Sequence, residues 1–128
     1  MLAIDTNVIV RYVTDDDPRQ SARAREAVRD NQVWVSTTVL LETGWVLRGV
    51  YGYSRADIAF AIREFAGLPT VTFEDTNLVA AALEQCERGV DFADALHLAA
   101  AGACDGFLTF DRRLIRSAAA GDLAVREP

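Results

Sequence analysis

Two aspartates stand directly after apolar segments that are predicted to be buried β-strands. Asp5 ends the segment 2–5, and Asp111 follows the segment 106–110. In an open parallel sheet, ligands bind in the crevice outside the carboxyl ends of the strands. We therefore expect the carboxylates of Asp5 and Asp111 to lie at one edge of a sheet, where they can act on a ligand.

Two further acids fall inside predicted helices, among apolar neighbours. Glu42 lies within Val-Leu-Leu-Glu-Thr-Gly-Trp, and Asp94 lies within Phe-Ala-Asp-Ala-Leu. A buried charge is costly unless it is paired or binds a metal. Each acid alone is explained as well by an ion pair with a nearby arginine such as Arg48 or Arg112. The two acids are informative because they accompany a pair at strand ends.

The four acids together predict a metal site. Two carboxylates ~5 Å apart repel by about 3 kcal/mol at an effective dielectric constant of 20. Four of them cannot all stay ionised at one site without a cation. Oxygen ligands alone suit Mg²⁺ or Mn²⁺ rather than zinc, and Mg²⁺ commonly joins carboxylates to a substrate phosphate. We therefore expect metal-assisted hydrolysis of a phosphodiester, in which an activated water attacks the phosphorus in line.

The net charge of the chain argues against a phosphodiester substrate, but the type of its basic residues is compatible with one. The net charge is −6 at pH 7, which taken alone argues against a nucleic-acid partner. All 13 basic residues are arginines, however, and arginine binds phosphate in a planar, bidentate manner. The absence of lysine excludes a P-loop, which needs Gly-Lys-Ser/Thr. It also argues against receiver domains and haloacid-dehalogenase-type phosphatases, which depend on a lysine.

No segment of the sequence is typical of a membrane or export signal. No apolar run reaches the ~18 residues that a membrane span requires. The start Met-Leu-Ala-Ile-Asp lacks the basic region and the long apolar stretch of a signal peptide. We expect a cytoplasmic protein that does not associate with a membrane.

The acids are carried by short apolar segments that alternate with helical ones. Asp17 before Pro18 is a helix cap, and Ser54 with Asp57 forms a capping box. Strands that alternate with helices predict right-handed crossovers and a parallel sheet. We predict one α/β domain over residues 1–128, a three-layer sandwich with a central, mainly parallel sheet of four or five strands. The expected strands are 2–5, 33–35, 70–73, 106–110 and 123–125, and the expected helices are 7–13, 18–29, 37–50, 55–66, 76–89, 92–102 and 112–120.

Four motifs in this order resemble those of PIN-domain ribonucleases over essentially the whole chain. They are Leu-Ala-Ile-Asp-Thr-Asn at residues 2–7, the mid-helix Glu42, Asp-Phe-Ala-Asp-Ala-Leu-His at 91–97, and Leu-Thr-Phe-Asp-Arg-Arg at 108–113. Chain length and motif order resemble the VapC-type toxins of bacterial toxin–antitoxin pairs. The resemblance implies a PIN-like fold.

The resemblance also implies roles for individual residues. It places active-site acids at Asp5, Glu42, Asp94 and Asp111. Asp5 and Asp94 are the most direct metal ligands, and Glu42 and Asp111 would bind directly or through water. It further implies that Asn7 orients Asp5 and that Thr109 is a polar residue beside the site.

The implied activity is that of a Mg²⁺- or Mn²⁺-dependent endoribonuclease that leaves a 5′-phosphate and a 3′-hydroxyl. The toxin subclass implies a tRNA or ribosomal RNA substrate, a small antitoxin that silences the enzyme, and a homodimer. Two alternatives remain open. One is a PIN-fold nuclease of RNA processing without an antitoxin, and the other is a non-catalytic RNA- or protein-binding module of the same fold.

Several residues near the motifs carry weaker expectations. Asp91 is expected to cap its helix, with a second-metal role as the alternative. His97 is expected to be a hydrogen-bonded helix residue rather than a catalytic base, and the acids at 15–17 a solvated loop rather than a metal cluster. The aromatic pair at 51 and 53 is a candidate surface for a partner or for base stacking. Five arginines are candidates for binding RNA phosphates or, equally, for surface ion pairs: Arg11, Arg48, Arg112, Arg113 and Arg116.

Overall fold

The computed structural model describes residues 1–128 and has the alternation of strands and helices that the sequence predicts. Element boundaries agree with the predicted ones to within a few residues. The second strand has its predicted bounds, the first, third and fourth are shorter than predicted, and the fifth is shifted toward the C-terminus. The elements are β1 (Leu2–Ala3), α1 (Thr6–Val13), α2 (Pro18–Asp30), β2 (Val33–Val35), α3 (Thr37–Gly49), α4 (Arg55–Ala66), β3 (Val71–Phe73), α5 (Thr76–Glu87), α6 (Phe92–Ala100), β4 (Phe107–Leu108), α7 (Arg112–Ser117) and β5 (Val125–Arg126).

The helix starts follow the capping residues that the sequence offers. The Asp17 carboxylate accepts the Gln20 amide at 3.1 Å, with Pro18 in the first turn of α2. Ser54 and Asp57 form the predicted capping box of α4. These bonds satisfy backbone donors that a helix leaves unpaired at its start. Local sequence chemistry therefore determines where the helices begin.

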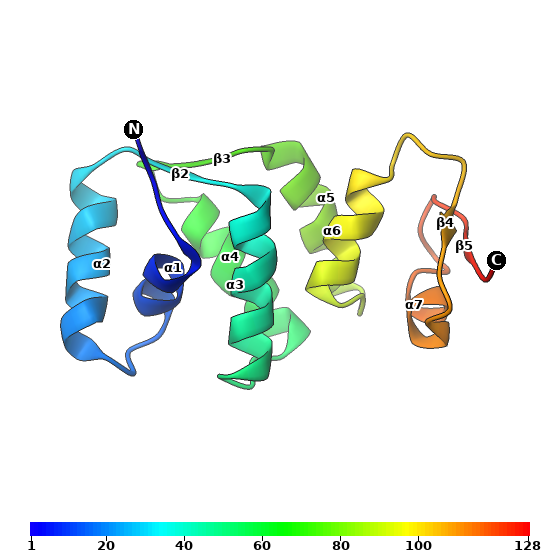
Figure 1. The fold of residues 1–128 in the computed structure, drawn as a ribbon, viewed down its shortest axis with the longest axis horizontal. Coiled ribbons are helices and arrows are strands. Elements are labelled where there is room, and N and C mark those ends of the chain that lie inside the picture. The colour runs from blue at the N-terminus through cyan, green and yellow to red at the C-terminus, as the bar shows by residue number, and fades with distance from the viewer.

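The first three strands form a parallel sheet in the order β1-β2-β3. Leu2 is the partner of Val33, and Val33 is in turn the partner of Val71. The central strand β2 buries Val33 and Val35 almost completely. We call residues 1–100 the body. Helix α4 packs against β3, and the other helices of the body pack against one another beside the sheet (Figure 1).

The last two strands do not join this sheet. β4 and β5 pair with each other in parallel and form a separate two-stranded sheet, with α7 between them in the chain. We call residues 106–128 the C-terminal arm and residues 101–105 the connecting loop. Figure 1 shows the arm at one end of the molecule, beyond α6. The α/β class and the parallel strands are confirmed, but the predicted single sheet is divided into three strands and two.

One hydrophobic core holds the body together and includes two residues of the arm. Its 23 buried residues come from the sheet and all seven helices, and Leu114 and Ala118 are those of the arm. Helix α3 approaches α6 closely where Gly44 faces the ring of Phe92. No helix combines the length and hydrophobicity that crossing a bilayer requires.

Candidate active site

Asp5 and Glu42 form the first group of acids, at the start of α1 and on the face of α3. Asp5 is the N-cap of α1, and its carboxylate accepts the Thr6 amide at 2.8 Å. The Thr6 hydroxyl donates a short hydrogen bond to the Glu42 carboxylate. Both acids, with Thr6, line a hollow of about 270 Å³. Thr6 therefore connects the two acids that the sequence assigns to one site.

The surroundings of this group differ from the expectation in three ways. Glu42 is exposed, although its apolar neighbours in sequence suggested burial, because the apolar residues on its own face, Val39 and Trp45, are themselves partly or largely exposed. Asn7 lines the same hollow but makes no hydrogen bond to Asp5, whose bound donor is the Thr6 amide. Sequence reasoning missed Thr6, although its place between Asp5 and Asn7 in the first motif was a usable signal.

Asp94 and Asp111 belong to the second group of acids. Asp94 lies in the first turn of α6 and is half-buried. Burial, followed by the negative charges of Asp91 and Asp111, raises the pKa of Asp94, while His97 acts in the opposite direction. The His97 side chain is exposed and forms no hydrogen bond, contrary to the hydrogen-bonded helix residue that was expected. Burial and the two neighbouring carboxylates therefore disfavour the ionised form of Asp94.

The backbone holds Asp111 firmly at the start of α7. Its carboxylate accepts the amides of Arg113 at 2.9 Å and Leu114 at 3.1 Å, so that Asp111 is the N-cap of this helix. The Thr109 hydroxyl accepts the Asp111 amide at 3.0 Å. Thr109 thus lies beside an acid of the site, and its hydrogen bond stabilises the turn that holds Asp111 in place.

Asp91 does not have the role predicted for it. It occupies the N-cap position of α6 but makes no capping hydrogen bond with its side chain. Its carboxylate instead lies 3.5 Å from the Arg48 guanidinium on α3. The ion pair between helices replaces the local cap, because the end of α3 brings a cation within reach.

The contact between α3 and α6 sets how the two groups of acids lie relative to each other. A Cβ atom on Gly44 would lie 2.5 Å from Cδ2 of Phe92, closer than side-chain atoms approach. Phe92 is itself buried and cannot easily move. The glycine two residues after Glu42 therefore allows the helix that carries Asp94 to pack directly against α3.

The donor atoms fit a hard divalent cation, but the acids are not gathered into one cluster. All candidate ligands are carboxylate oxygens, and burial, followed by the charges of Asp91 and Asp111, raises the pKa of Asp94. No three histidine, cysteine or carboxylate side chains lie close enough together to hold a metal. The structure brings Asp5 together with Glu42 and Asp94 together with Asp111, and it does not unite the two pairs.

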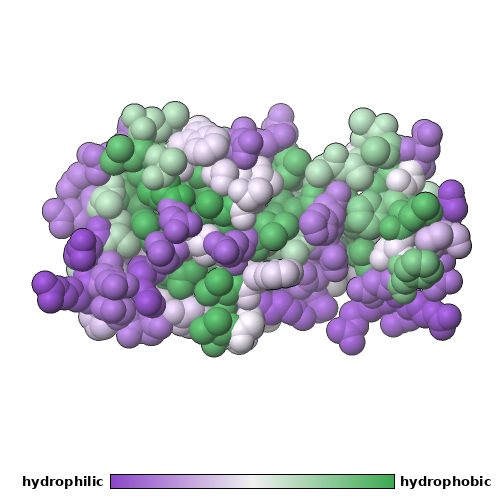
Figure 2. Space-filling model, viewed as in Figure 1, coloured by the Kyte–Doolittle hydropathy of each residue, from purple (hydrophilic) through white to green (hydrophobic).

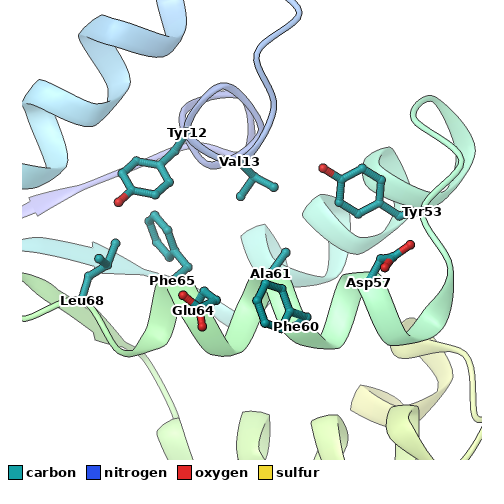
Figure 3. Close-up of a pocket in the computed structure, with 9 residues that line it drawn as sticks. All are labelled: Tyr12, Val13, Tyr53, Asp57, Phe60, Ala61, Glu64, Phe65 and Leu68. Carbon is teal, nitrogen blue, oxygen red and sulfur yellow. The ribbon is translucent and has the colours of Figure 1, made fainter.

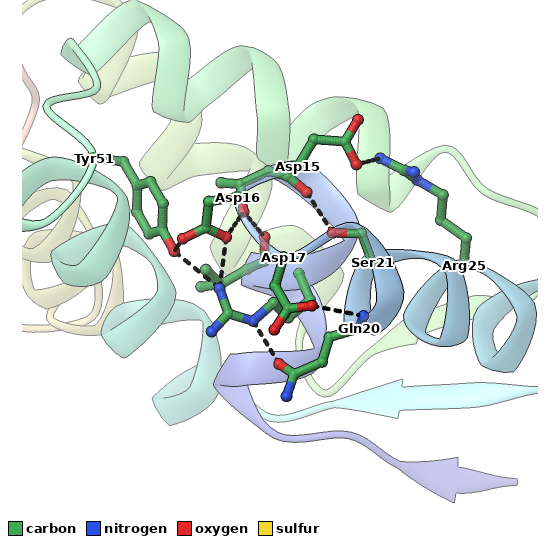
Figure 4. A network of polar contacts seen from close by, with 10 residues as sticks. Asp15, Asp16, Asp17, Gln20, Ser21, Arg25 and Tyr51 are labelled. Atoms are coloured by element: carbon green, nitrogen blue, oxygen red, sulfur yellow. Dashed lines mark hydrogen bonds and ion pairs between the residues drawn. The ribbon is translucent and has the colours of Figure 1, made fainter.

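The acidic loop before α2 forms a polar network with Arg11 and Tyr51 (Figure 4). Arg11 contacts Asp16 at 2.6 Å, and the Tyr51 hydroxyl donates to the same carboxylate at 2.7 Å. The hydrogen bond from Tyr51, followed by that from Arg11, lowers the pKa of Asp16. Asp15 pairs with Arg25 at 3.3 Å. Tyr51 and the acidic loop thus connect α1, α2 and the end of α3.

Three arginines of the arm line a shallow hollow beside α7. Arg112, Arg116 and Arg126 surround a space of about 410 Å³ together with Glu127, which lies 3.4 Å from Arg112. Arg113 and Arg116 have no ion-pair partner within the chain. The arm therefore presents exposed guanidinium groups next to Asp111.

A larger hollow, of about 500 Å³, lies away from both groups of acids (Figure 3). It lies between α1 and α4, and most of its lining is apolar. Tyr12 and Tyr53 lie on one side, and Phe60 and Phe65 come from α4. Its chemistry suits an apolar partner rather than a phosphate.

Comparison with known families gives one match. The PIN domain family matches residues 2–120, a range that contains all four acids of the two groups. A comparison with curated proteins gave no match. Since the match covers nearly the whole chain and the strands and helices follow the expected order, the chain belongs to the PIN domain family.

Proposed function

We propose that this protein is a metal-dependent endoribonuclease that uses Asp5, Glu42, Asp94 and Asp111. The observation that carries the proposal is the second group, where α6 and α7 begin with acids and where burial, followed by the charges of Asp91 and Asp111, raises the pKa of Asp94. Negative charge held together without a matching cation is the arrangement that divalent-metal sites require. Membership of the PIN domain family supports a nuclease.

The roles of the acids follow from their positions in the motifs, and the roles of Thr6 and Thr109 follow from their contacts. Asp5 and Asp94 would hold Mg²⁺ or Mn²⁺, with Glu42 and Asp111 binding directly or through water. The bound ion would supply an activated water and neutralise charge on the phosphate. Thr6 fixes the Glu42 carboxylate by donating to it, and Thr109 fixes the turn that presents Asp111. Asn7 lines the hollow and is placed to contact substrate.

The arm supports RNA as the substrate despite the acidic chain. It carries four arginines against three acids, whereas the rest of the chain carries nine arginines against sixteen acids. The hollow of Arg112, Arg116 and Arg126 lies on the same short helix and strand pair as Asp111. Guanidinium groups position a nucleic-acid backbone without reading its sequence. The arm would therefore hold the RNA backbone while the acids cleave it.

We further propose that the nuclease is the toxin of a toxin–antitoxin pair and cleaves tRNA or ribosomal RNA. A small antitoxin would then silence it, and the apolar hollow between α1 and α4, with the exposed Phe60 on its rim, offers such a protein a place to dock. An RNA-processing nuclease of the same fold would lack this partner. Expression in a bacterial host should arrest growth, and a co-expressed antitoxin should relieve the arrest.

Incubation of the purified protein with total RNA tests the activity. Cleavage should need Mg²⁺ or Mn²⁺, stop in excess EDTA, and leave 5′-phosphate and 3′-hydroxyl ends. Sequencing of the new ends identifies the RNA class. Cleavage that persists undiminished in EDTA would rule out the metal mechanism, and the absence of cleavage by a folded, metal-loaded protein would favour a binding module.

A further inference from the structure

The sheet of the body ends at an open edge. Leu2 and Ile4 donate their amides to Gln32 and Trp34, at 2.8 and 3.1 Å. Backbone groups of successive strand residues point in opposite directions, so the N–H and C=O of Ala3 point away from β2. Met1 and Leu2 remain 76% and 55% exposed. β1 is therefore an unpaired edge strand with apolar side chains in solvent.

The arm has an open edge of the same kind. Phe107 and Thr109 donate to Ala124 and Arg126 of the neighbouring strand, at 2.8 and 3.1 Å. The backbone of Leu108 between them points the other way, away from β5. Leu108 and Phe110 are 55% and 79% exposed. Figure 2 shows hydrophobic residues reaching the surface at the arm's end of the molecule.

The two open edges are complementary. Both belong to parallel sheets, and an acid of the candidate site follows each strand within three residues. Pairing of Ala3 beside Leu108 in parallel would place Asp5 and Asp111 at the same carboxyl edge. It would also join the two sheets into one of five strands. The excess of arginine in the arm matches the excess of acid in the body.

Within one chain the two edges are far apart. In Figure 1, β1 lies toward one end of the longest axis and β4 at the other, with α3, α5 and α6 between them. Leu114 and Ala118 anchor the arm in the core of its own chain, where both are buried. The arm therefore cannot reach its own β1 without leaving this anchorage, whereas the β1 of another molecule is free to approach it.

We propose that two copies of this chain exchange C-terminal arms, so that β4 of each copy pairs with β1 of the other. Each copy has one open β1 and one open β4, and the exchange is therefore reciprocal and closes in a symmetric dimer. It removes both edges, which are otherwise liable to aggregate. Each active site then combines Asp5 and Glu42 of one copy with Asp94 and Asp111 of its partner. This part of the inference rests on the proposed nuclease.

Cross-linking tests the exchange without reference to activity. In the full chain with Cys104→Ser, Ala3→Cys and Leu108→Cys are introduced together and treated with a short thiol-reactive cross-linker. We expect covalent dimers on a denaturing gel, while either single cysteine alone gives far fewer. A cross-linked monomer would show that the arm pairs with its own β1, and either that result or the absence of any cross-link overturns the proposal. Sedimentation of the unaltered chain gives a second measurement, and a monomer at cross-linking concentrations also overturns it.

Complementation tests the shared site. Asp5→Asn and Asp111→Asn, each inactive alone, are unfolded, mixed and refolded together. In an exchanged heterodimer one site carries both substitutions and the other carries neither. With random assembly about half of the dimers are mixed, and one of their two sites is intact. The mixture should therefore cleave RNA at about a quarter of the rate of the same amount of wild-type protein. Restoration below a few per cent would overturn the shared site, because a site built within one chain always keeps its substitution. If cross-linked dimers form but the wild-type protein cleaves no RNA, the exchange stands and the nuclease proposal fails.

Discussion

The body and the arm contain the same kinds of element, but different forces hold them. In the body, β2 lies between two strands, and its valines are almost completely buried. In the arm, β4 and β5 pair only with each other, and exposed apolar side chains lie at the end of β4. The body is organised by burial, whereas the arm depends on the Asp111 cap, one pair of strands and two buried anchors. A segment with so few contacts within the chain is suited to making contacts outside it.

The two cysteines give the largest expected contrast between the body and the segment that joins it to the arm. Cys86 is buried in the core, and burial, aided by Asp91, raises its pKa to about 11. At pH 8 only about one Cys86 in a thousand is then a thiolate, the reactive form. Cys104 is exposed in the connecting loop. We expect Ellman's reagent to label Cys104 immediately and Cys86 at least ~100-fold more slowly.

The variant Cys104→Ser serves as the control, because it should remove the fast phase and leave the slow one. Comparable rates for the two cysteines would mean that the body opens as readily as the loop, and that the contrast between the regions is false.

Asp94→Asn should have the next largest effect, and of opposite sign on activity and stability. Outer-shell partners of metal ligands typically contribute 10–100-fold, so the loss of a ligand should reduce RNA cleavage by more than about 100-fold. Without metal, the variant should melt slightly higher than wild type, because it removes one of several crowded charges. The gain should be at most about 1 kcal/mol, or a few degrees, since Asp94 is partly exposed and water screens it.

Thermal melts in EDTA and in Mg²⁺ test both effects, and added Mg²⁺ should stabilise wild type more than the variant. Asp122→Asn is the matched control, because Asp122 is an exposed acid of the arm outside both groups, and it should change neither quantity. A metal-free Asp94→Asn protein that melts lower than wild type would show that Asp94 is instead a structural partner.

The sequence predicted elements well in both regions, because caps and apolar segments are local signals. Ser54, Asp17 and Asp111 each begin a helix where predicted. The partners of the strands are not a local property. Residues 106–110 are typical of a strand that can pair with any open parallel edge, so their sequence could not predict a sheet separate from that of the body.

The site was predictable in its residue types and less so in its contacts. The acid positions follow from the motifs, but the exposure of Glu42 depends on which face of α3 meets the core. The Asp91–Arg48 pair depends on how α3 lies against α6. Thr6, which donates to Glu42 from 36 residues away, depends on the packing of α1 against α3. These contacts are set by tertiary packing and override local propensity.

Gly44→Ala tests the packing that the sequence could not reveal. The new methyl group would collide with the buried Phe92 ring, and overpacking of this kind costs about 1–3 kcal/mol. Alanine also favours the helix by about 1 kcal/mol. We expect the collision to prevail, so that the free energy of unfolding in urea falls and cleavage weakens as α6 moves.

Gly49→Ala is the matched control on the same helix, because a Cβ there meets nothing within 4 Å. It should raise the free energy of unfolding by about 0.4–1 kcal/mol. Equal stabilisation by both substitutions would show that α3 and α6 are not in close contact.

Tyr51→Phe should have the smallest effect and compares polar contacts in the two regions. The Tyr51 hydroxyl is the first cause of the lowered pKa of Asp16, and its removal should return that pKa toward 3.8. Because the folded-state pKa lies below the unfolded one, the stabilisation is present above the unfolded value and is lost as pH falls through the folded value. Wild type should therefore exceed the variant in stability at pH 7, and the difference should shrink below pH 4. Carboxyl NMR titration of Asp16 measures the shift, and urea unfolding at pH 3 and pH 7 measures its consequence.

The control lies in the arm, where the Arg112 guanidinium is 3.4 Å from the Glu127 carboxylate and 80% of the Arg112 side chain is exposed. Arg112→Gln should therefore change stability at neither pH. An unchanged Asp16 pKa in Tyr51→Phe would assign the effect to Arg11 alone, whose contact with Asp16 would then suffice to join the acidic loop to α1.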